Sequence, residues 1–126
     1  MSRDAKSLLT DVEECAEAIK ESTAGLEFDA DLANREKQDS VERRLIIIGE
    51  ALNQLDSVAP DLAEKTPDLR KAIGLRNRLT HVYHQIDHAA IWDTAVKDIP
   101  QLSRIIGTLL SELSSPRPSE EHKSTP

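Results

Sequence analysis

Apolar residues recur at every third or fourth position near the start of the chain, which is the repeat of one face of an α-helix. The stripe is formed by Ala5, Leu8, Leu9, Val12, Ala16 and Ile19. Asp4 precedes it and can accept a hydrogen bond from a free N–H group of the first helical turn. The pattern therefore predicts a first helix over residues 5–19 that is capped by Asp4.

The stretch STAGLEFDADL interrupts this period, and Gly25 is the expected break. Leu26 and Phe28 are expected to plug the core there. A second helix is predicted over residues 38–55, and its apolar stripe consists of Val41, Leu45, Ile48, Leu52 and Leu55. Its centre, LIIIGEAL, is apolar over too wide an arc for a single stripe, which predicts contacts on two sides.

The next stretch, DSVAPDLAEKTPDL, contains two prolines and is predicted to be a loop with room for one helical turn after Pro60. Thr66, Pro67 and Asp68 then form a start signal for a helix. They supply a capping hydroxyl, a proline at the first helical position and an acid in the first turn. A third helix is therefore predicted from about Pro67 to about Gln85.

Asp87 can cap a fourth helix, whose apolar positions are Ile91, Ala95, Ile99, Leu102, Ile106, Leu109 and Leu113. Pro100 lies inside this run, so a kink is predicted there rather than two separate helices. After Leu113 the stretch SSPRPSEEHKSTP has no large apolar residue, which predicts a disordered tail. The whole pattern predicts an all-α, up-and-down bundle of four main helices with a disordered C-terminal tail.

Composition agrees with one helical domain. The chain has 126 residues, 38% of them hydrophobic, and its only aromatic residues are Phe28, Tyr83 and Trp92. A core of Leu, Ile, Val and Ala suits packed helices better than a β-sandwich. No apolar run is long enough for a membrane span or a signal peptide, so a soluble, cytoplasmic protein is expected. Cys15 is the only cysteine and is expected to serve in helix packing.

The formal net charge of -7 argues against a protein that coats nucleic acid by bulk attraction. The charge is unevenly distributed, however. No acidic residue lies between Asp68 and Asp87, whereas four basic residues do: Arg70, Lys71, Arg76 and Arg78. This acid-free stretch contains the octapeptide RNRLTHVY, residues 76–83, where the predicted third helix carries its unusual polar residues.

On a helical wheel with about 100° per residue, Arg76 and Tyr83 fall in register with the apolar stripe that begins at Leu69. Asn77 and His81 fall on a polar face that flanks the stripe, together with His84 and His88. One interpretation is that Arg76 and Tyr83 extend their polar ends to water from the edge of the core. The other is that a guanidinium, an amide, an imidazole and a phenol form a reactive set.

Such a set suits a phosphodiester. A histidine can take the proton from a ribose 2′-hydroxyl or return one to the leaving 5′-oxygen. An arginine can bind the non-bridging oxygens and stabilise the additional charge of the transition state. Neither task needs a metal, and cleavage through the 2′-hydroxyl would restrict the substrate to RNA.

A zinc site is the competing interpretation of the histidines. His81, His84, Asp87 and His88 have spacings of three and four residues, which can place ligands on one helical face. No cysteine accompanies them, and His88 lies at or beyond the start of the next predicted helix. The sequence therefore favours the metal-free chemistry.

The stretch GLRNRLTHVYHQID, residues 74–87, resembles the signature of the HepT-type HEPN-domain ribonuclease toxins, Arg-x4-His-x-Tyr. The likeness extends to IIGEAL in the predicted second helix and to WDTAVKDIPQL in the fourth. It covers nearly all of residues 1–113, which are taken as a HEPN (HepT-like) ribonuclease domain, with 114–126 as the tail. By this resemblance the bundle is expected to be HEPN-like.

The resemblance implies a homodimeric, metal-independent endoribonuclease without a cofactor, acting on mRNA or tRNA as the toxin of a type VII HEPN/MNT toxin–antitoxin system. Its antitoxin is a minimal nucleotidyltransferase that silences the toxin by adenylylation of the motif tyrosine. Carried over by position, Arg76 and His81 are the catalytic pair, Asn77 is a supporting polar residue and Tyr83 is the modification site. A non-catalytic helical module that binds nucleotides or RNA remains the alternative.

Overall fold

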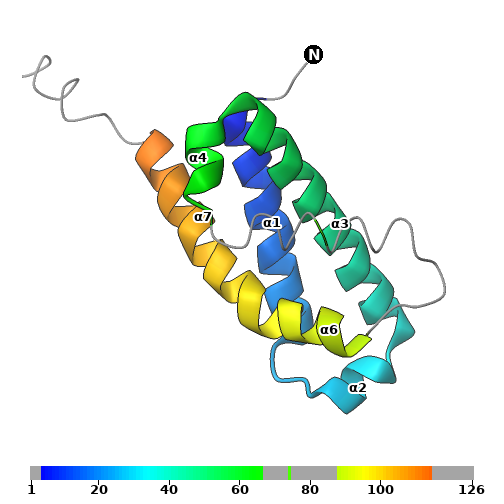
Figure 1. Cartoon of the computed structure of the whole chain (residues 1–126). Helices are drawn as coiled ribbons and strands as arrows, with labels where there is room; N and C mark the ends of the chain where they lie inside the picture. The colour runs from blue at the N-terminus through cyan, green and yellow to red at the C-terminus, as the bar shows by residue number, and fades with distance from the viewer. Residues whose placement is uncertain (1–3, 67–73, 75–87, 115–126) are drawn as a thin grey trace, which may run out of the picture.

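The computed structural model describes residues 4–66, 74 and 88–114, and every regular element in this part of the chain is helical. The elements are α1 (Ala5–Thr23), α2 (Phe28–Leu32), α3 (Arg35–Val58), α4 (Pro60–Glu64), α6 (His88–Asp93), the π-helical turn η1 (Thr94–Asp98) and α7 (Ile99–Ser114) (Figure 1). The predicted all-α class is confirmed. Most of the predicted third helix, and residues 115–126 of the predicted tail, lie outside the described residues. Ser114, predicted as the first residue of the tail, is the last residue of α7.

Helix α1 begins where the sequence predicted and extends four residues further, to Thr23. The carboxylate of Asp4 accepts a hydrogen bond from the N–H of Ser7 at 2.8 Å, which confirms the predicted cap. The predicted stripe is buried at Leu8, Leu9, Val12, Ala16 and Ile19. Ala5, in the first turn, is only half-buried.

Helix α3 also exceeds its prediction, because it begins at Arg35 and ends at Val58. Its N-terminus is capped by Asn34, whose side chain accepts from the N–H of Lys37 at 3.1 Å. The whole predicted stripe is buried, and so are Gly49 and Ala51 beside it. The apolar centre of this helix is thus covered over a wider arc than one stripe, as its composition predicted.

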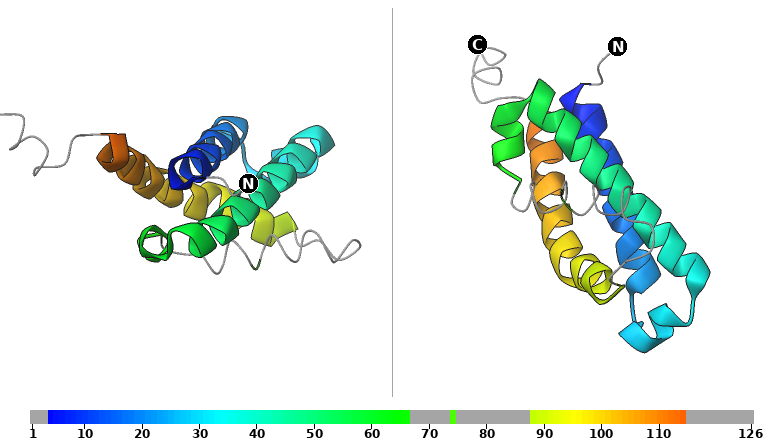
Figure 2. Two further views of the ribbon diagram at one scale, coloured as in Figure 1. Left: turned by 90° about the horizontal axis from the view of Figure 1, so that it is seen from above. Right: turned by 45° about the vertical axis from the view of Figure 1, so that its right-hand side comes forward.

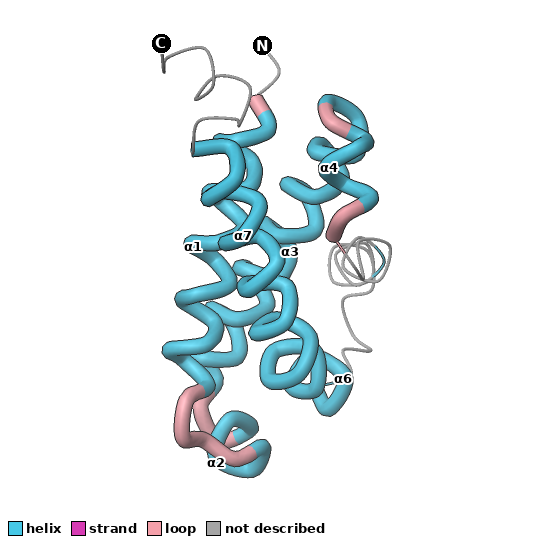
Figure 3. Tube along the Cα trace, turned by 90° about the vertical axis from the view of Figure 1, so that its left-hand side faces the viewer, coloured by secondary structure: helices cyan, strands magenta, loops and turns pink. Residues whose placement is uncertain are grey.

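Helix α1 packs against both α3 and α7, and the ribbon views show that it runs antiparallel to each of them (Figures 1 and 2). The core therefore lies along α1, where the most deeply buried side chains of the three helices meet. Two short helices lie toward opposite ends of this frame: α2 at the end where α6 begins, and α4 against α3 at the other (Figure 3). The single turn allowed after Pro60 is thus present as α4.

Between α1 and α3 the chain turns at Gly25, which has a φ of 71°. The predicted break is therefore correct, but α2 was not predicted, because a five-residue helix is too short to show a period. Leu26 and Phe28 are half-buried rather than fully buried plugs. The Phe28 ring instead packs on Trp92 of α6, with the ring centroids 6.2 Å apart and the planes tilted by 46°.

The predicted fourth helix is one continuous helical run made of α6, η1 and α7, and its direction changes between α6 and α7 (Figure 1). The wide turn η1 ends just before Pro100, and the N–H of Ile99 donates to the carbonyl of Thr94, five residues back. Proline has no N–H and its ring displaces the carbonyl four residues before it, which disrupts the α-helical pattern locally. The irregularity thus occurs next to Pro100, where the sequence placed it.

The apolar positions of this run are buried from Ile91 to Leu109, as predicted. Leu113 is the exception, since 42% of it is exposed. It lies in the last turn of α7, where the end of a helix meets fewer neighbours than its middle. Among the helices that the structure describes, none combines the length and the apolar character that a membrane crossing requires.

Replacing Gly25 with alanine should lower the free energy of unfolding by about 1–2 kcal/mol, because a Cβ is disfavoured at a positive φ. No heavy atom lies within 4 Å of the position that this Cβ would take, so the cost comes from the backbone alone. Chemical denaturation of both proteins would measure it.

Gly107 offers a matched control. It lies within α7 and also has nothing within 4 Å of an added Cβ. Gly107→Ala should therefore stabilise the protein by roughly 0.5–1 kcal/mol, the gain expected in a helix interior. Equal effects of the two substitutions would contradict the role assigned to the turn.

Candidate active site

The four residues predicted to carry the chemistry, Arg76, Asn77, His81 and Tyr83, lie outside the described residues. Their roles therefore stay predictions from the sequence. The structure describes the chain immediately before and after this segment, at Thr66 and His88, and within it Gly74, which is helical and half-buried. These positions show where the described frame ends before the segment and where it resumes after it.

Thr66 is the last described residue before the segment, and it is firmly held. Only 4% of it is exposed. Its hydroxyl donates to the carbonyl of Ala63 at 2.6 Å, and its N–H donates to the same oxygen at 3.0 Å. The hydroxyl oxygen keeps lone pairs that can accept the capping hydrogen bond predicted from the sequence. The chain thus leaves α4 for Pro67 from a fixed point.

His88 is the first residue of α6 and is half-buried. One turn further, Ile91 is 6% exposed and belongs to the core, so α6 is packed into the frame directly after the segment. The other proposed metal ligands, His81, His84 and Asp87, lie outside the described residues. Within the described residues, no group of three or more His, Cys, Asp and Glu side chains is arranged to hold a metal ion.

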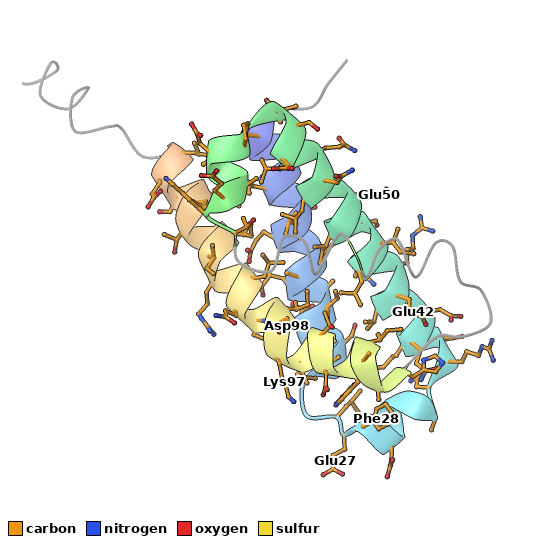
Figure 4. All side chains as sticks on the ribbon, in the orientation of Figure 1. Glu27, Phe28, Glu42, Glu50, Lys97 and Asp98 are labelled. Carbon is orange, nitrogen blue, oxygen red and sulfur yellow. The ribbon has the colours of Figure 1, made fainter. Side chains whose placement is uncertain are left out.

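The described helices carry most of the acidic residues of the chain. Figure 4 shows such side chains at separate places on the frame, with Glu27 directly before α2 and Glu42 and Glu50 on α3. By contrast, Arg70, Lys71, Arg76 and Arg78 all belong to the acid-free stretch. The frame also carries basic residues but is net negative, so it would repel phosphate groups overall, whereas the acid-free stretch would attract them.

Cys15 lies in a groove of about 580 Å³ between α1 and α3, which is also lined by Arg43, Arg44 and Ile47. The side chain is half-buried and packs against the core. Burial raises the pKa of the thiol, so less of the reactive thiolate is present at neutral pH. The structure thus confirms the predicted packing role.

The sequence pattern gave no indication of a polar contact between α1 and α7. The hydroxyl of Ser103 lies 2.9 Å from a carboxylate oxygen of Glu13 and 3.0 Å from one of Glu17. The one available signal was the four-residue spacing of the two acids, which places them on the same side of a helix. Nothing in the sequence indicated which helix would face them.

Comparison with known families gives a match to the model described as ribonuclease HepT-like, over residues 12–109. A protein of Thermococcus cleftensis named "Probable ribonuclease HepT" is 34% identical over 102 residues, covering 81% of this chain and 92% of the relative. A protein of Methanocaldococcus jannaschii that is named as an RNase is 33% identical over 104 residues, which is 81% of this chain and 93% of that protein.

A second protein of Methanocaldococcus jannaschii, also named as an RNase, is 28% identical over 113 residues. That alignment covers 88% of this chain and 91% of the relative. No solved structure matches the chain. The matched region includes the segment with RNRLTHVY and the helices on both sides of it.

Proposed function

The chain belongs to the family of HepT-like ribonucleases and is therefore a ribonuclease, and we propose that it cuts RNA internally, without a metal ion, as a cytoplasmic toxin. The observation that carries this proposal is the presence of Arg76, His81 and Tyr83 at the family spacing, in the longest stretch of the chain that has no acidic residue. Asn77 is the supporting polar residue beside the arginine.

The proposed reaction begins when His81 takes the proton of a ribose 2′-hydroxyl, which then attacks the adjacent phosphorus. The bond to the 5′-oxygen of the next nucleotide breaks, and that oxygen receives a proton from the imidazolium that His81 has become. Arg76 binds the non-bridging oxygens and stabilises the negative charge that accumulates on them. The products are a 2′,3′-cyclic phosphate and a free 5′-hydroxyl.

A homodimer would concentrate positive charge locally, although the net charge of each chain is negative. The chain is acidic overall, with a formal net charge of -7, and its acidic residues are concentrated on the described helices. Two acid-free stretches that face one another across a symmetric interface would form a basic cleft. This arrangement, which family resemblance suggests, would attract mRNA or tRNA while the rest of the surface repels it.

Tyr83 is proposed as the site at which a cognate nucleotidyltransferase antitoxin of the MNT type attaches adenylyl groups from ATP. It lies seven residues after Arg76, which is close to two helical turns. On the predicted helix a phosphate joined to Tyr83 would thus lie on the same face as the guanidinium. It would block the site both by its charge and by its size.

RNA cleavage by the purified protein should continue in an excess of EDTA, because the proposed acid, base and electrostatic stabiliser are all side chains. Gel analysis of a labelled RNA, with chemical identification of the cyclic phosphate end, would measure it. A matched DNA strand should remain intact, since it lacks the 2′-hydroxyl. Activity that disappears with EDTA and returns with zinc would favour the histidine metal site instead.

The non-catalytic alternative predicts a different result in the same assay. A binding module would shift the RNA in a gel and leave its length unchanged, even with prolonged incubation. Binding without any new RNA ends, in protein shown by mass spectrometry to be unmodified, would select that alternative.

A further inference from the structure

One polar contact between α1 and α7 is made by the hydroxyl of Ser103, a residue that is only 4% exposed. Its oxygen lies 2.9 Å from Oε1 of Glu13 and 3.0 Å from Oε1 of Glu17. Both distances are those of ordinary hydrogen bonds between oxygen atoms. Two carboxyl groups of α1 thus meet one hydroxyl group of α7.

A hydroxyl group has a single proton and can donate to only one of these two oxygens. If both carboxyl groups were ionised, only one carboxylate oxygen could receive the Ser103 proton. The other would lie at hydrogen-bond distance from the Ser103 oxygen with no proton between them. A second proton on one of the acids removes this conflict. The Ser103 oxygen can then accept from the protonated acid while its own proton goes to the other.

The surroundings indicate which acid is neutral. Glu17 is exposed, and its Oε1 lies 3.0 Å from the ammonium group of Lys20, which favours the ionised form. Glu13 is half-buried, and its second oxygen, Oε2, is fully covered with no hydrogen-bond partner among the described residues. Covering an oxygen in this way costs less when the carboxyl group is uncharged.

The pKa values of the two acids are shifted in the directions that this assignment requires: that of Glu13 is raised and that of Glu17 is lowered. Burial is the largest cause acting on Glu13 and raises its pKa, and Glu17 raises it further; a hydrogen bond that Ser103 donated to an ionised Glu13 would lower it. The hydrogen bond from Lys20, followed by that from Ser103, lowers the pKa of Glu17.

Charged groups on the neighbouring elements that the structure describes do not alter this assignment. Within the described residues, the charges that shift the pKa of Glu13 are those of Glu17 and Lys20, both on α1. The charged residues on either side of Ser103 in η1 and α7 are Lys97, Asp98, Arg104 and Glu112. The ammonium of Lys97 pairs with Asp93 at 3.5 Å, and Arg104 lines a surface hollow along α7 together with Glu112.

We propose that Glu13 keeps its proton in the folded protein and that this proton makes the packing of α7 on α1 dependent on pH. The hydrogen bonds run in one direction: Glu13 donates to Ser103, Ser103 donates to the carboxylate of Glu17, and Lys20 donates to the same carboxylate. When Glu13 loses its proton to solvent, two carboxylates compete for the single proton of Ser103. One of the two hydrogen bonds that join Ser103 to Glu13 and Glu17 is then lost.

The sign of the effect follows from linkage. Because the pKa of Glu13 is higher in the folded than in the unfolded chain, its contribution to stability is fully present below the unfolded pKa. The contribution is lost as the pH rises through the folded pKa. Most carboxylates in ion pairs act in the opposite sense, because they lose their contribution to stability as the pH falls. This contact should therefore stabilise the protein in mildly acidic solution.

A carbon NMR titration of the full-length protein with labelled glutamate side chains tests the proposal directly, with the Glu13 signal assigned by its loss in Glu13→Gln. The midpoint for Glu13 is expected above the ordinary value of about 4.3 for glutamate. Glu17→Gln should move that midpoint down, because it removes the neighbouring negative charge. A midpoint at or below the ordinary value would overturn the proposal.

Thermal unfolding as a function of pH provides the second measurement. Glu13→Gln keeps an uncharged side chain at every pH, so its melting temperature should exceed that of the wild type by a few degrees at about pH 8. The difference should shrink or reverse near pH 4, where Glu13 itself is protonated. Glu14→Gln, which alters an exposed acid of the same helix, should follow the wild-type curve. Identical behaviour of the two variants would contradict the proposal.

Discussion

RNA cleavage should fall by about 10²–10⁴-fold when His81 is changed to alanine, the range that a positioned acid–base group contributes. His81 is the proposed base for the 2′-hydroxyl, and no other group at the motif spacing can replace it. Initial rates on a fluorescent RNA, compared at equal protein concentration, would measure the loss. Circular dichroism should show the same helix content for both proteins, since the frame of α1, α3 and α7 does not include this residue.

His84 provides the control for this experiment. It is a histidine on the same predicted helix, three residues further along, and it is not part of the family signature. His84→Ala should therefore retain activity close to that of the wild type. An unchanged rate in His81→Ala, or an equal loss in both variants, would remove His81 from the proposed mechanism.

Cells that produce the Tyr83→Phe variant should stop growing even when the cognate nucleotidyltransferase is present. Phenylalanine keeps the ring but lacks the oxygen to which an adenylyl group could be attached. The RNA-cleaving activity should stay within about tenfold of the wild type, because catalysis is assigned to Arg76 and His81. Growth curves with and without the antitoxin would measure the escape.

The chemical counterpart of that experiment is intact-mass analysis after incubation with the nucleotidyltransferase and ATP. The wild-type chain should gain mass in adenylyl increments, and Tyr83→Phe should gain none. Modified wild-type protein should also lose cleavage activity. Adenylylation of the variant at another residue, with full inhibition, would contradict the proposed role of Tyr83.

The pattern of apolar residues was sufficient to predict the three long helical runs that the structure describes. The stripes of α1 and α3 are buried as predicted, because an apolar face repeated over several turns can be satisfied only by a helix packed on a core. The ends were less accurate. Both helices exceed their predictions, since polar residues such as Arg35 continue a helix without adding to the stripe.

Features that depend on contacts between distant residues were not predictable from the pattern. The packing of Phe28 on Trp92 and the meeting of Glu13 with Ser103 each require knowledge of which helices are neighbours. The candidate site shows the opposite situation. Its residues were recognised from their chemistry and family spacing, and the structure describes the anchors on both sides, at Thr66 and His88, rather than the reacting groups.

The wide turn η1 changes the direction in which the apolar side chains point around the axis of the run from α6 to α7. The core positions Ile91, Ala95 and Ile99 follow one another at two successive steps of four residues. Each such step overshoots a full α-helical turn by about 40°, so two of them in a regular helix would rotate Ile91 about 80° away from Ile99. A turn with more residues per revolution absorbs this rotation. The segment next to the predicted catalytic helix can therefore point its apolar side chains into the same core as α7, although the chain there has one residue too many for a regular helix.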